Sequence, residues 1–310
     1  MAEIVIFVHG TYDQCVVKKN TAAWYSKNNS TYKDGLMQYA PENLESNALD
    51  TKSVALKRRF GEDDDIFDRL TAISALTGVA VANIYVFGWS GLCETAAREL
   101  GGYRLAIVLN EIKCRGYTTP SKLITIEQGA NVSIITHSHG GNVLGHALMY
   151  FEANDKIINK AYLFACPFFT SIRNNINKRS NSQLNAKTMN DRIANQNHID
   201  GENLWIRSDG GVSKVKEMVY SFFSPYDQIQ SKGAGGMHAG AVRSELIVIG
   251  DINQFENHSI TPNNDKGMNA TYYNKTDIRS ELTIGASVGK SHTDLNHAAA
   301  YVAAKAVISS

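Results

Sequence analysis

The sequence predicts an α/β protein built on a doubly wound, mostly parallel sheet with flanking helices. Three observations predict this class. The apolar stretches are short continuous runs rather than alternating patterns, which is typical of parallel strands covered on both faces. These runs alternate with segments in which apolar residues recur at helical spacing. The alternation covers most of the chain and therefore favours right-handed crossovers within one sheet.

Each expected strand is a run rich in β-branched and aromatic residues. The strands are expected at Glu3–Val8, Ala80–Phe87, Asn131–Thr136, Lys160–Ala165, Val215–Phe223 and Glu245–Ile249. Helices are expected between and after them, at Glu94–Cys114, Gly141–Glu152 and His297–Ile308. No internal repeat and no linker divides the chain, so residues 1–310 are expected to form a single domain.

Three polar stretches interrupt the alternation and are expected to be insertions into that domain. They span about residues 20–70, 172–211 and 254–289. The second stretch is rich in Asn, Ser, Lys and Arg and follows the end of an expected strand, so it is a candidate lid. Surface insertions of this kind are where substrate choice is expected to reside.

Composition excludes several classes of function. The 31 Lys and Arg residues nearly balance the 30 Asp and Glu residues, which leaves a net charge of +1. A chain without a basic field is not expected to bind nucleic acid or to adhere to membranes through a polybasic patch. The four cysteines form no CxxC pair, so neither a zinc knuckle nor a dense disulfide scaffold fits them.

No apolar stretch is long enough to span a bilayer, and the N-terminal run lacks the features of a signal peptide. The chain is therefore expected to be cytoplasmic, or to be exported by a route that needs no cleaved signal. A transient contact with a membrane surface stays open, and the oligomeric state cannot be deduced from these patterns.

The most informative motif is the segment Thr136-His137-Ser138-His139-Gly140-Gly141, which joins an expected strand to an expected helix. A strand, a serine on a sharp turn, a glycine two positions later and a helix together make a nucleophile elbow. The glycine lets the helix pass close to the strand, and the helix N-terminus favours a developing negative charge. In this segment the chain resembles the α/β-hydrolase superfamily, and in particular its lipase-like branch.

One residue departs from the family pattern, because Thr136 stands where the family has the first glycine of Gly-x-Ser-x-Gly. A β-branched side chain at this crowded crossing requires different local packing. Two hypotheses follow. The chain is either a serine esterase or lipase, or a non-catalytic α/β-hydrolase-like binding protein whose site is degenerate.

A second segment, Phe7-Val8-His9-Gly10-Thr11, resembles the oxyanion strand of the superfamily, which ends in His-Gly. The resemblance implies that the backbone N–H groups of Thr11 and His139 form the oxyanion hole, with His9 supporting the loop. It also implies a minimal sheet that lacks the first strands of the full superfamily. A further segment, Trp89-Ser90-Gly91, resembles a structural turn of lipase-like hydrolases.

The remaining triad members are also implied by the resemblance. Asp227 follows the strand that ends at Phe223 and falls where the family order Ser, Asp, His requires an acid; Asp251 is the weaker rival. His292 lies just before the C-terminal helix in Ser-His-Thr-Asp-Leu, which resembles the lipase-like form. His258 is the competing base because it follows the last expected strand closely. The motif favours His292, and the choice stays open.

The expected chemistry is acyl transfer through an acyl-enzyme, with no metal and no organic cofactor. The resemblance implies a lipid ester as the substrate, with phospholipids among the candidates, since lipase-like proteins of this size without a signal peptide occur among secreted bacterial effectors. The aromatic residues that end the strands after the elbow are candidates for an acyl-chain pocket, although ordinary core residues would show the same pattern. They are Phe168, Phe169, Phe222 and Phe223.

Overall fold

A computed structural model describes the core elements of the chain, with gaps between them. The described residues are 1–10, 36–38, 66–89, 95–118, 125–152, 155–166, 205, 211–223, 254–262, 268–272 and 298–309. Within them the main sheet has eight strands, in the order β10-β9-β8-β7-β6-β1-β3-β2. A separate two-stranded sheet pairs β4 (Tyr117–Thr118) with β5 (Thr125–Ile126).

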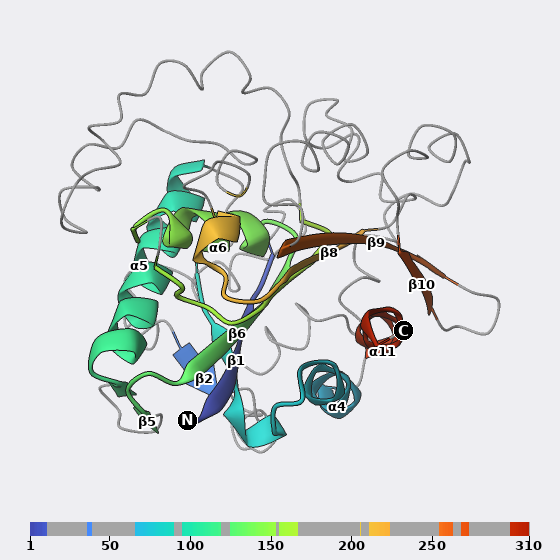
Figure 1. The fold of residues 1–310 in the computed structure, drawn as a ribbon, viewed down its shortest axis with the longest axis horizontal. Helices are drawn as coiled ribbons and strands as arrows, with labels where there is room; N and C mark the ends of the chain where they lie inside the picture. Colours follow the sequence, from blue (N-terminus) through green and yellow to red (C-terminus); the bar gives the residue numbers. More distant parts are fainter. Residues whose placement is uncertain are drawn as a thin grey trace, which may run out of the picture.

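The main sheet is mostly parallel, as the sequence predicts (Figure 1). Each strand from β3 through β1, β6, β7, β8 to β9 runs parallel to its neighbour, while β2 and β10 are antiparallel at the two edges. The bounds are β1 (Glu3–Val8), β2 (Leu36–Gln38), β3 (Ile84–Phe87), β6 (Asn131–His137), β7 (Ala161–Phe164), β8 (Val219–Phe223), β9 (Phe255–Pro262) and β10 (Met268–Tyr272).

Helices cover both faces of the sheet (Figure 1). The helices α5 (Thr95–Cys114) and α6 (Gly140–Leu148) pack together on one face, and α4 (Ile66–Thr77) and α11 (Ala298–Ile308) pack together on the other. Two 3-10 turns lie at Val81–Asn83 and Gly211–Lys214.

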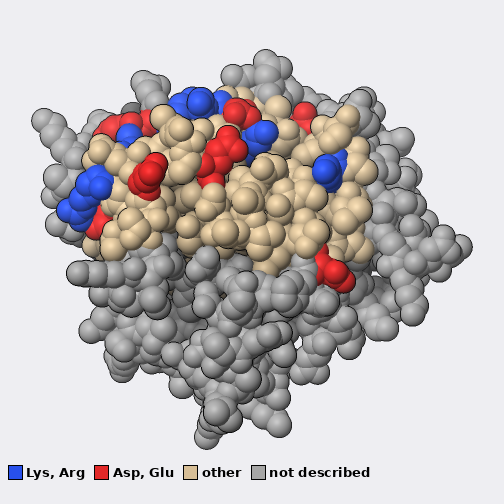
Figure 2. All heavy atoms as spheres, turned by 90° about the horizontal axis from the view of Figure 1, so that it is seen from below, with Lys and Arg blue, Asp and Glu red and all other residues tan. Residues whose placement is uncertain are grey.

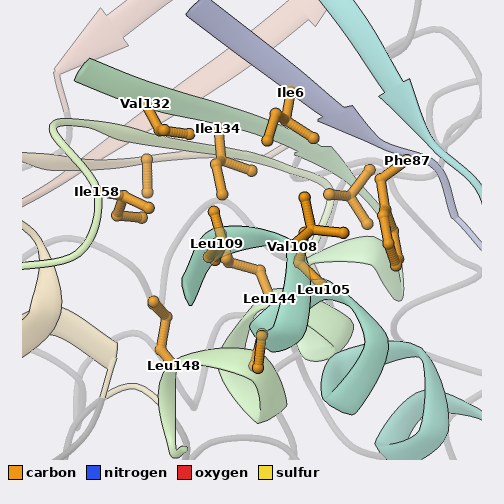
Figure 3. Packing of buried hydrophobic residues seen from close by; sticks show 14 of the residues in the cluster. Ile6, Phe87, Leu105, Val108, Leu109, Val132, Ile134, Leu144, Leu148 and Ile158 are labelled. Carbon is orange, nitrogen blue, oxygen red and sulfur yellow. The ribbon is translucent and has the colours of Figure 1, made fainter. Parts of the chain in front are cut away.

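The alternation of side chains along β1 explains the two cores. Ile4, Ile6 and Val8 point into the cluster with α5 and α6, whereas Val5 and Phe7 point into the cluster with α4 and α11. Figure 3 shows Ile6, together with Val132 and Ile134 of β6, facing Leu105, Leu109 and Leu144 of the two helices. Burying one such side chain stabilises the fold by roughly 1.5–3 kcal/mol. A continuous apolar strand is therefore what this central position requires.

The winding direction of the sheet reverses at β1. The chain runs from β1 to β3 on one side and then returns to β6 on the other side of β1. Ligands of open α/β sheets bind outside the carboxyl ends of the strands at such a reversal, because the crossovers diverge there and leave a crevice. The carboxyl ends of β1 and β6 therefore mark the place to look for a site.

The strands and helices expected within the described residues are confirmed in type, with shifts at their ends. The strand expected at Ala80–Phe87 begins only at Ile84, after the 3-10 turn. The strand expected at Val215–Phe223 begins only at Val219. Gly141–Glu152 is helical as Gly140–Leu148. The expected strand Glu245–Ile249 lies outside the described residues.

Parts of the three expected insertions lie within the described residues. Residues 254–289 contain β9 and β10, which extend the sheet, because polar strands suffice at its outer end. Residues 172–211 end within the core, since Trp205 is fully buried and Gly211 packs against its ring. The segment 20–70 includes β2 and the start of α4.

None of the described helices is both long enough and apolar enough to cross a membrane. On the face shown in Figure 2, basic and acidic side chains of the described residues lie interspersed rather than separated by sign. This arrangement agrees with the near-zero net charge of the chain.

Glycine at position 102 is required by the contact between α5 and α6. A Cβ on Gly102 would overlap the Cβ of His146 and would lie 2.9 Å from the Val143 carbonyl oxygen. We expect Gly102→Ala to lower the free energy of unfolding by about 1–3 kcal/mol, despite the better helix propensity of alanine. Urea unfolding measures the change.

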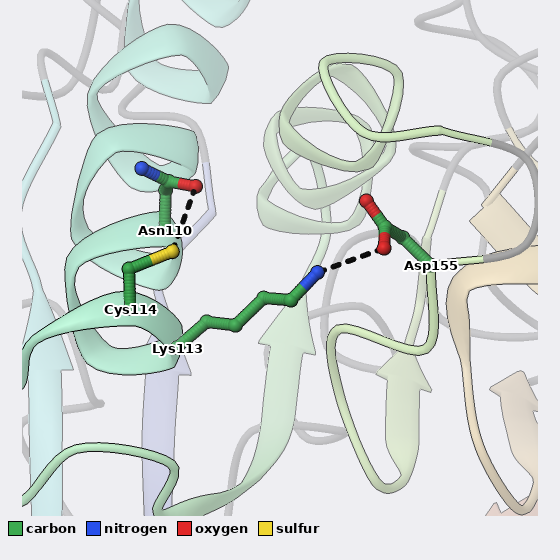
Figure 4. A network of polar contacts seen from close by, with 4 residues as sticks. All are labelled: Asn110, Lys113, Cys114 and Asp155. Carbon is green, nitrogen blue, oxygen red and sulfur yellow. Dashed lines mark hydrogen bonds and ion pairs between the residues drawn. The ribbon is translucent and has the colours of Figure 1, made fainter.

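Lys113 on the same helix provides the control. Its ammonium lies 2.8 Å from a carboxylate oxygen of Asp155, beside the Asn110–Cys114 contact (Figure 4). Both partners of this ion pair are largely exposed, so Lys113→Ala is expected to cost less than about 1 kcal/mol. Equal costs for the two variants would contradict the close packing of α5 on α6.

Candidate active site

Ser138 stands on a strained turn directly after β6. Its backbone φ is +51°, a left-handed conformation that residues other than glycine rarely adopt. Two hydrogen bonds hold the turn: the Ser138 N–H donates to the Phe164 carbonyl at 2.8 Å, and the Gly141 N–H donates to the Ser138 carbonyl at 3.0 Å. The helix α6 begins two residues later, at Gly140. This is the geometry that the elbow motif predicts.

Two glycines bring the end of β1 against this turn. A Cβ on Gly10 would lie 2.7 Å from the Cβ of Ser138 and 3.0 Å from Nδ1 of His137. A Cβ on Gly140 would overlap the backbone carbonyl oxygens of Val8 and His9. The His-Gly end of β1 and the serine turn are therefore in direct contact, at the point where the sheet reverses its winding.

Glycine at position 141 leaves room for the side chain of Thr136. Thr136 is fully buried, and a Cβ on Gly141 would lie 3.3 Å from its hydroxyl oxygen and overlap the Cys166 sulfur. The space that the second glycine leaves in α6 thus accommodates the β-branch of Thr136. Within the described part of the chain, the Thr136 hydroxyl has no hydrogen-bond partner.

This unsatisfied hydroxyl predicts the effect of an isosteric substitution. We expect Thr136→Val to raise the free energy of unfolding by about 1 kcal/mol, because it removes a buried polar group that costs about 1–3 kcal/mol. Gly141→Ala is the opposite case, because the added methyl group would overlap the Cys166 sulfur, and it is expected to lower the free energy of unfolding. Thermal and urea unfolding measure both. A Thr136→Val variant less stable than the wild type would show that the hydroxyl is satisfied.

His139 occupies the N-cap of α6, with φ −61° and ψ −10°. Its backbone amide directly follows Ser138, the expected nucleophile, and is therefore at the expected position of an oxyanion donor. The partial positive charge at a helix N-terminus favours an anion here. Thr11, the other expected donor, lies outside the described residues.

His9 is buried and holds the end of β3. The Trp89 N–H donates to Nε2 of His9 at 3.2 Å, and the Trp89 indole N–H donates to the His9 carbonyl at 2.8 Å. Nδ1 of His9 lies 2.8 Å from the Gly10 carbonyl, and the two rings stack with centroids 5.5 Å apart. These contacts agree with the expected supporting role of His9.

The structure separates His258 from Ser138. His258 lies within β9, and its row in the sheet runs through Phe222 and Phe164 to His137. Three strand spacings make about 14 Å, which is too far for a hydrogen bond to the neighbouring serine. The Nε2 atom of His258 pairs instead with Glu256 at 3.1 Å. The distance from Ser138 and the pairing with Glu256 therefore do not support His258 as the base.

Burial of the His258 ring lowers its pKa from 6.5, although the hydrogen bond and the negative charge of Glu256 oppose the shift. The unfolded chain then binds more protons than the folded one, so stability falls as the pH drops below about 6.5. We expect His258→Gln to reduce the loss of unfolding free energy between about pH 7.5 and pH 5. Urea unfolding at both pH values tests this. An unchanged pH dependence would contradict it.

Phe222, one of the candidates for an acyl-chain pocket, packs in a buried core cluster. It is fully buried, and it stacks between Phe164, at a centroid distance of 4.5 Å, and His258, at 5.2 Å. These contacts favour the alternative that Phe222 is an ordinary core residue. The backbone of Phe223 ends β8. The other expected site residues that lie outside the described part of the chain are Phe168, Phe169, Asp227, Asp251 and His292.

Two residues near the turn were not anticipated from the sequence. Cys166 fills the space beside Gly141, and its burial raises the pKa of the thiol, which keeps it protonated and poorly nucleophilic. Trp205 donates from its indole N–H to the Gly141 carbonyl at 3.1 Å. Neither residue belongs to a motif, so only the tertiary structure reveals them.

No protein-family model matches the chain, and no curated protein matches it. Among the described residues, no group of three or more His, Cys, Asp or Glu side chains is placed to hold a metal ion. The geometry around Ser138 is therefore the main indication of function.

Proposed function

We propose that this chain is a serine hydrolase of carboxylic esters, with an α/β-hydrolase fold and Ser138 as its nucleophile. One observation carries the proposal: a serine with φ +51° lies on the turn between β6 and α6, against the His-Gly end of β1. Backbone strain of about 1–3 kcal/mol persists where the surrounding structure enforces it, and it clusters at active sites. The close fit of Thr136 against Gly141 supports an intact site over a degenerate one.

The proposed mechanism has two acyl-transfer steps. His292 takes the proton of the Ser138 hydroxyl as its oxygen attacks the ester carbonyl, and Asp227 orients the imidazole and stabilises its charged form. The backbone N–H groups of Thr11 and His139 stabilise the oxyanion, which is worth about 10²–10³ in rate for one donor. His292 then protonates the leaving alcohol, and water cleaves the acyl-enzyme by the same route.

The proposed substrate is a lipid ester, with phospholipids as the first class to examine. The lipase-like form of the elbow and of the segment around His292 supports this choice. Phe168, Phe169, Phe222 and Phe223 are the candidates for contacts with the acyl chain, and the burial of Phe222 favours the alternative of a core residue at that position.

Purified protein assayed on short-chain and long-chain p-nitrophenyl esters tests the activity, and a phospholipid panel read by mass spectrometry tests the substrate class. We expect hydrolysis of the esters, with release of a fatty acid from one position of a phospholipid. Absence of ester hydrolysis across the panel would favour a non-catalytic binding protein. Ester hydrolysis without phospholipid cleavage would restrict the proposal to an esterase.

A further inference from the structure

Trp205 connects the polar stretch 172–211 to the first turn of α6. Its side chain is fully buried, and its indole N–H donates to the carbonyl of Gly141 at 3.1 Å. Gly211, at the end of the same stretch, lies against the ring, since a Cβ there would be 2.7 Å from Cε3 of Trp205. The backbone at Gly211 therefore packs on the ring, while the indole N–H binds the helix.

The helix that accepts this bond has a sequence that favours its first turn only weakly. The nine residues of α6 include glycine at positions 140, 141 and 145. Glycine loses more conformational freedom in a helix than any other residue. The N-cap residue is His139, which is not one of the residues whose side chains stabilise a helix start best. Tertiary contacts must therefore hold the first turn, and the bond from Trp205 is one of them.

Two hydrogen bonds lead from Trp205 to the amide of His139. The indole N–H donates to the Gly141 carbonyl, and the Gly141 N–H donates to the Ser138 carbonyl at 3.0 Å. The Ser138 carbonyl and the His139 N–H belong to one trans peptide group, which is planar, so this N–H points opposite to the carbonyl. A donor that holds the Ser138 carbonyl in place therefore also sets the direction of the His139 amide.

We propose that Trp205 is a positioning residue, which through its indole N–H holds Gly141, and with it the peptide between Ser138 and His139, in the orientation that stabilises the oxyanion. This inference rests on the proposed ester hydrolysis at Ser138. Trp205 acts through the backbone of α6 rather than through contact with the substrate. The stretch 172–211 thereby contributes to the geometry of the nucleophile turn through its buried end.

Removing the indole N–H while keeping an aromatic ring tests this role. With the p-nitrophenyl ester that the wild type cleaves fastest, we expect Trp205→Phe to lower kcat about tenfold with KM unchanged, because small displacements of a catalytic group act on the transition state. The rate at which a fluorophosphonate labels Ser138 is expected to fall by a similar factor, since the attack develops the same kind of oxyanion. Benzothienylalanine at position 205 is the second variant, because it keeps both rings and replaces only the N–H by sulfur. It is expected to lower kcat by a similar factor.

The control is Leu148→Val at the other end of α6, where the side chain is also fully buried. This variant is expected to lower the midpoint of thermal unfolding but to retain kcat within a few fold, since it leaves the first turn of the helix unchanged. Circular dichroism measures folding of each protein.

Three results would each overturn the positioning role: an equal loss of kcat in Leu148→Val, a change in KM instead of kcat, or wild-type kcat in the benzothienylalanine variant. An inactive wild type would overturn the proposed function. A wild type that depends on Ser138 but tolerates the loss of the indole N–H would overturn this inference alone.

Discussion

Replacing Ser138 by alanine is expected to lower kcat on p-nitrophenyl esters by about 10⁶-fold, the cost typical of removing a nucleophilic serine. The fold should be retained, because Ala165 adopts a similar left-handed conformation, with φ +49°, at the end of the neighbouring strand β7. Alanine is therefore compatible with the turn. The comparison of kcat with the thermal unfolding temperature separates chemistry from stability.

Ser133→Ala provides the matched control. Ser133 is also a buried serine and lies on the same strand β6, five positions before the turn. We expect this variant to retain kcat within a few fold. Activity that survives in Ser138→Ala, or that falls equally in Ser133→Ala, would exclude Ser138 as the nucleophile.

Ser138→Gly adds a test of strain at the same position. Glycine adopts positive φ without steric cost, so this variant is expected to raise the free energy of unfolding by about 1 kcal/mol while abolishing activity. Active sites typically contain residues whose strained conformation lowers the stability of the fold but is needed for function. A variant less stable than the wild type would show that the turn is not strained.

Replacing His292 by alanine is expected to lower kcat by about 10⁴-fold or more, because the base of a triad acts as a unit with its nucleophile. The control is His258→Gln, which is expected to retain most of the activity. The structure supports this control, since His258 is paired with Glu256 within β9, three strands from the serine strand. The pH dependence of kcat/KM for both variants gives a second readout.

The reverse result would change which histidine is assigned as the base. A loss of orders of magnitude in His258→Gln, with His292→Ala near the wild type, would assign the base to β9 and would require a rearrangement of that strand. Similar small losses in both variants would mean that neither histidine takes the serine proton.

The central strands were predictable because burial on both faces demands continuous apolar sequence. Glu3–Val8 is observed with the expected bounds, and Asn131–His137 extends one residue further than expected. The strand Phe255–Pro262 was missed because it mixes Glu256 and His258 with apolar residues and ends at a proline, a pattern typical of loops and outer strands. The strand propensity of the residues predicts little for an outer strand such as this one, which is less tightly packed than the central strands.

The elbow was predictable because its residues are contiguous and each has a local reason. Glycine at position 140 permits the close approach to β1, and Ser138 takes the turn. The contacts that complete the site join residues far apart in the sequence. His9 with Trp89, and Thr136 with Gly141 and Cys166, are products of the sheet order, which no local pattern encodes.

Covalent labelling shows directly whether Ser138 is an activated nucleophile. A fluorophosphonate reacts preferentially with an activated serine, so incubation followed by intact-mass and peptide mass spectrometry measures both the extent and the position of reaction. We predict a single phosphonyl adduct on Ser138 in the wild type, which is absent from Ser138→Ala and preserved in Ser133→Ala. An unlabelled wild-type protein, or an adduct on another residue, would contradict the assignment of Ser138 as the nucleophile.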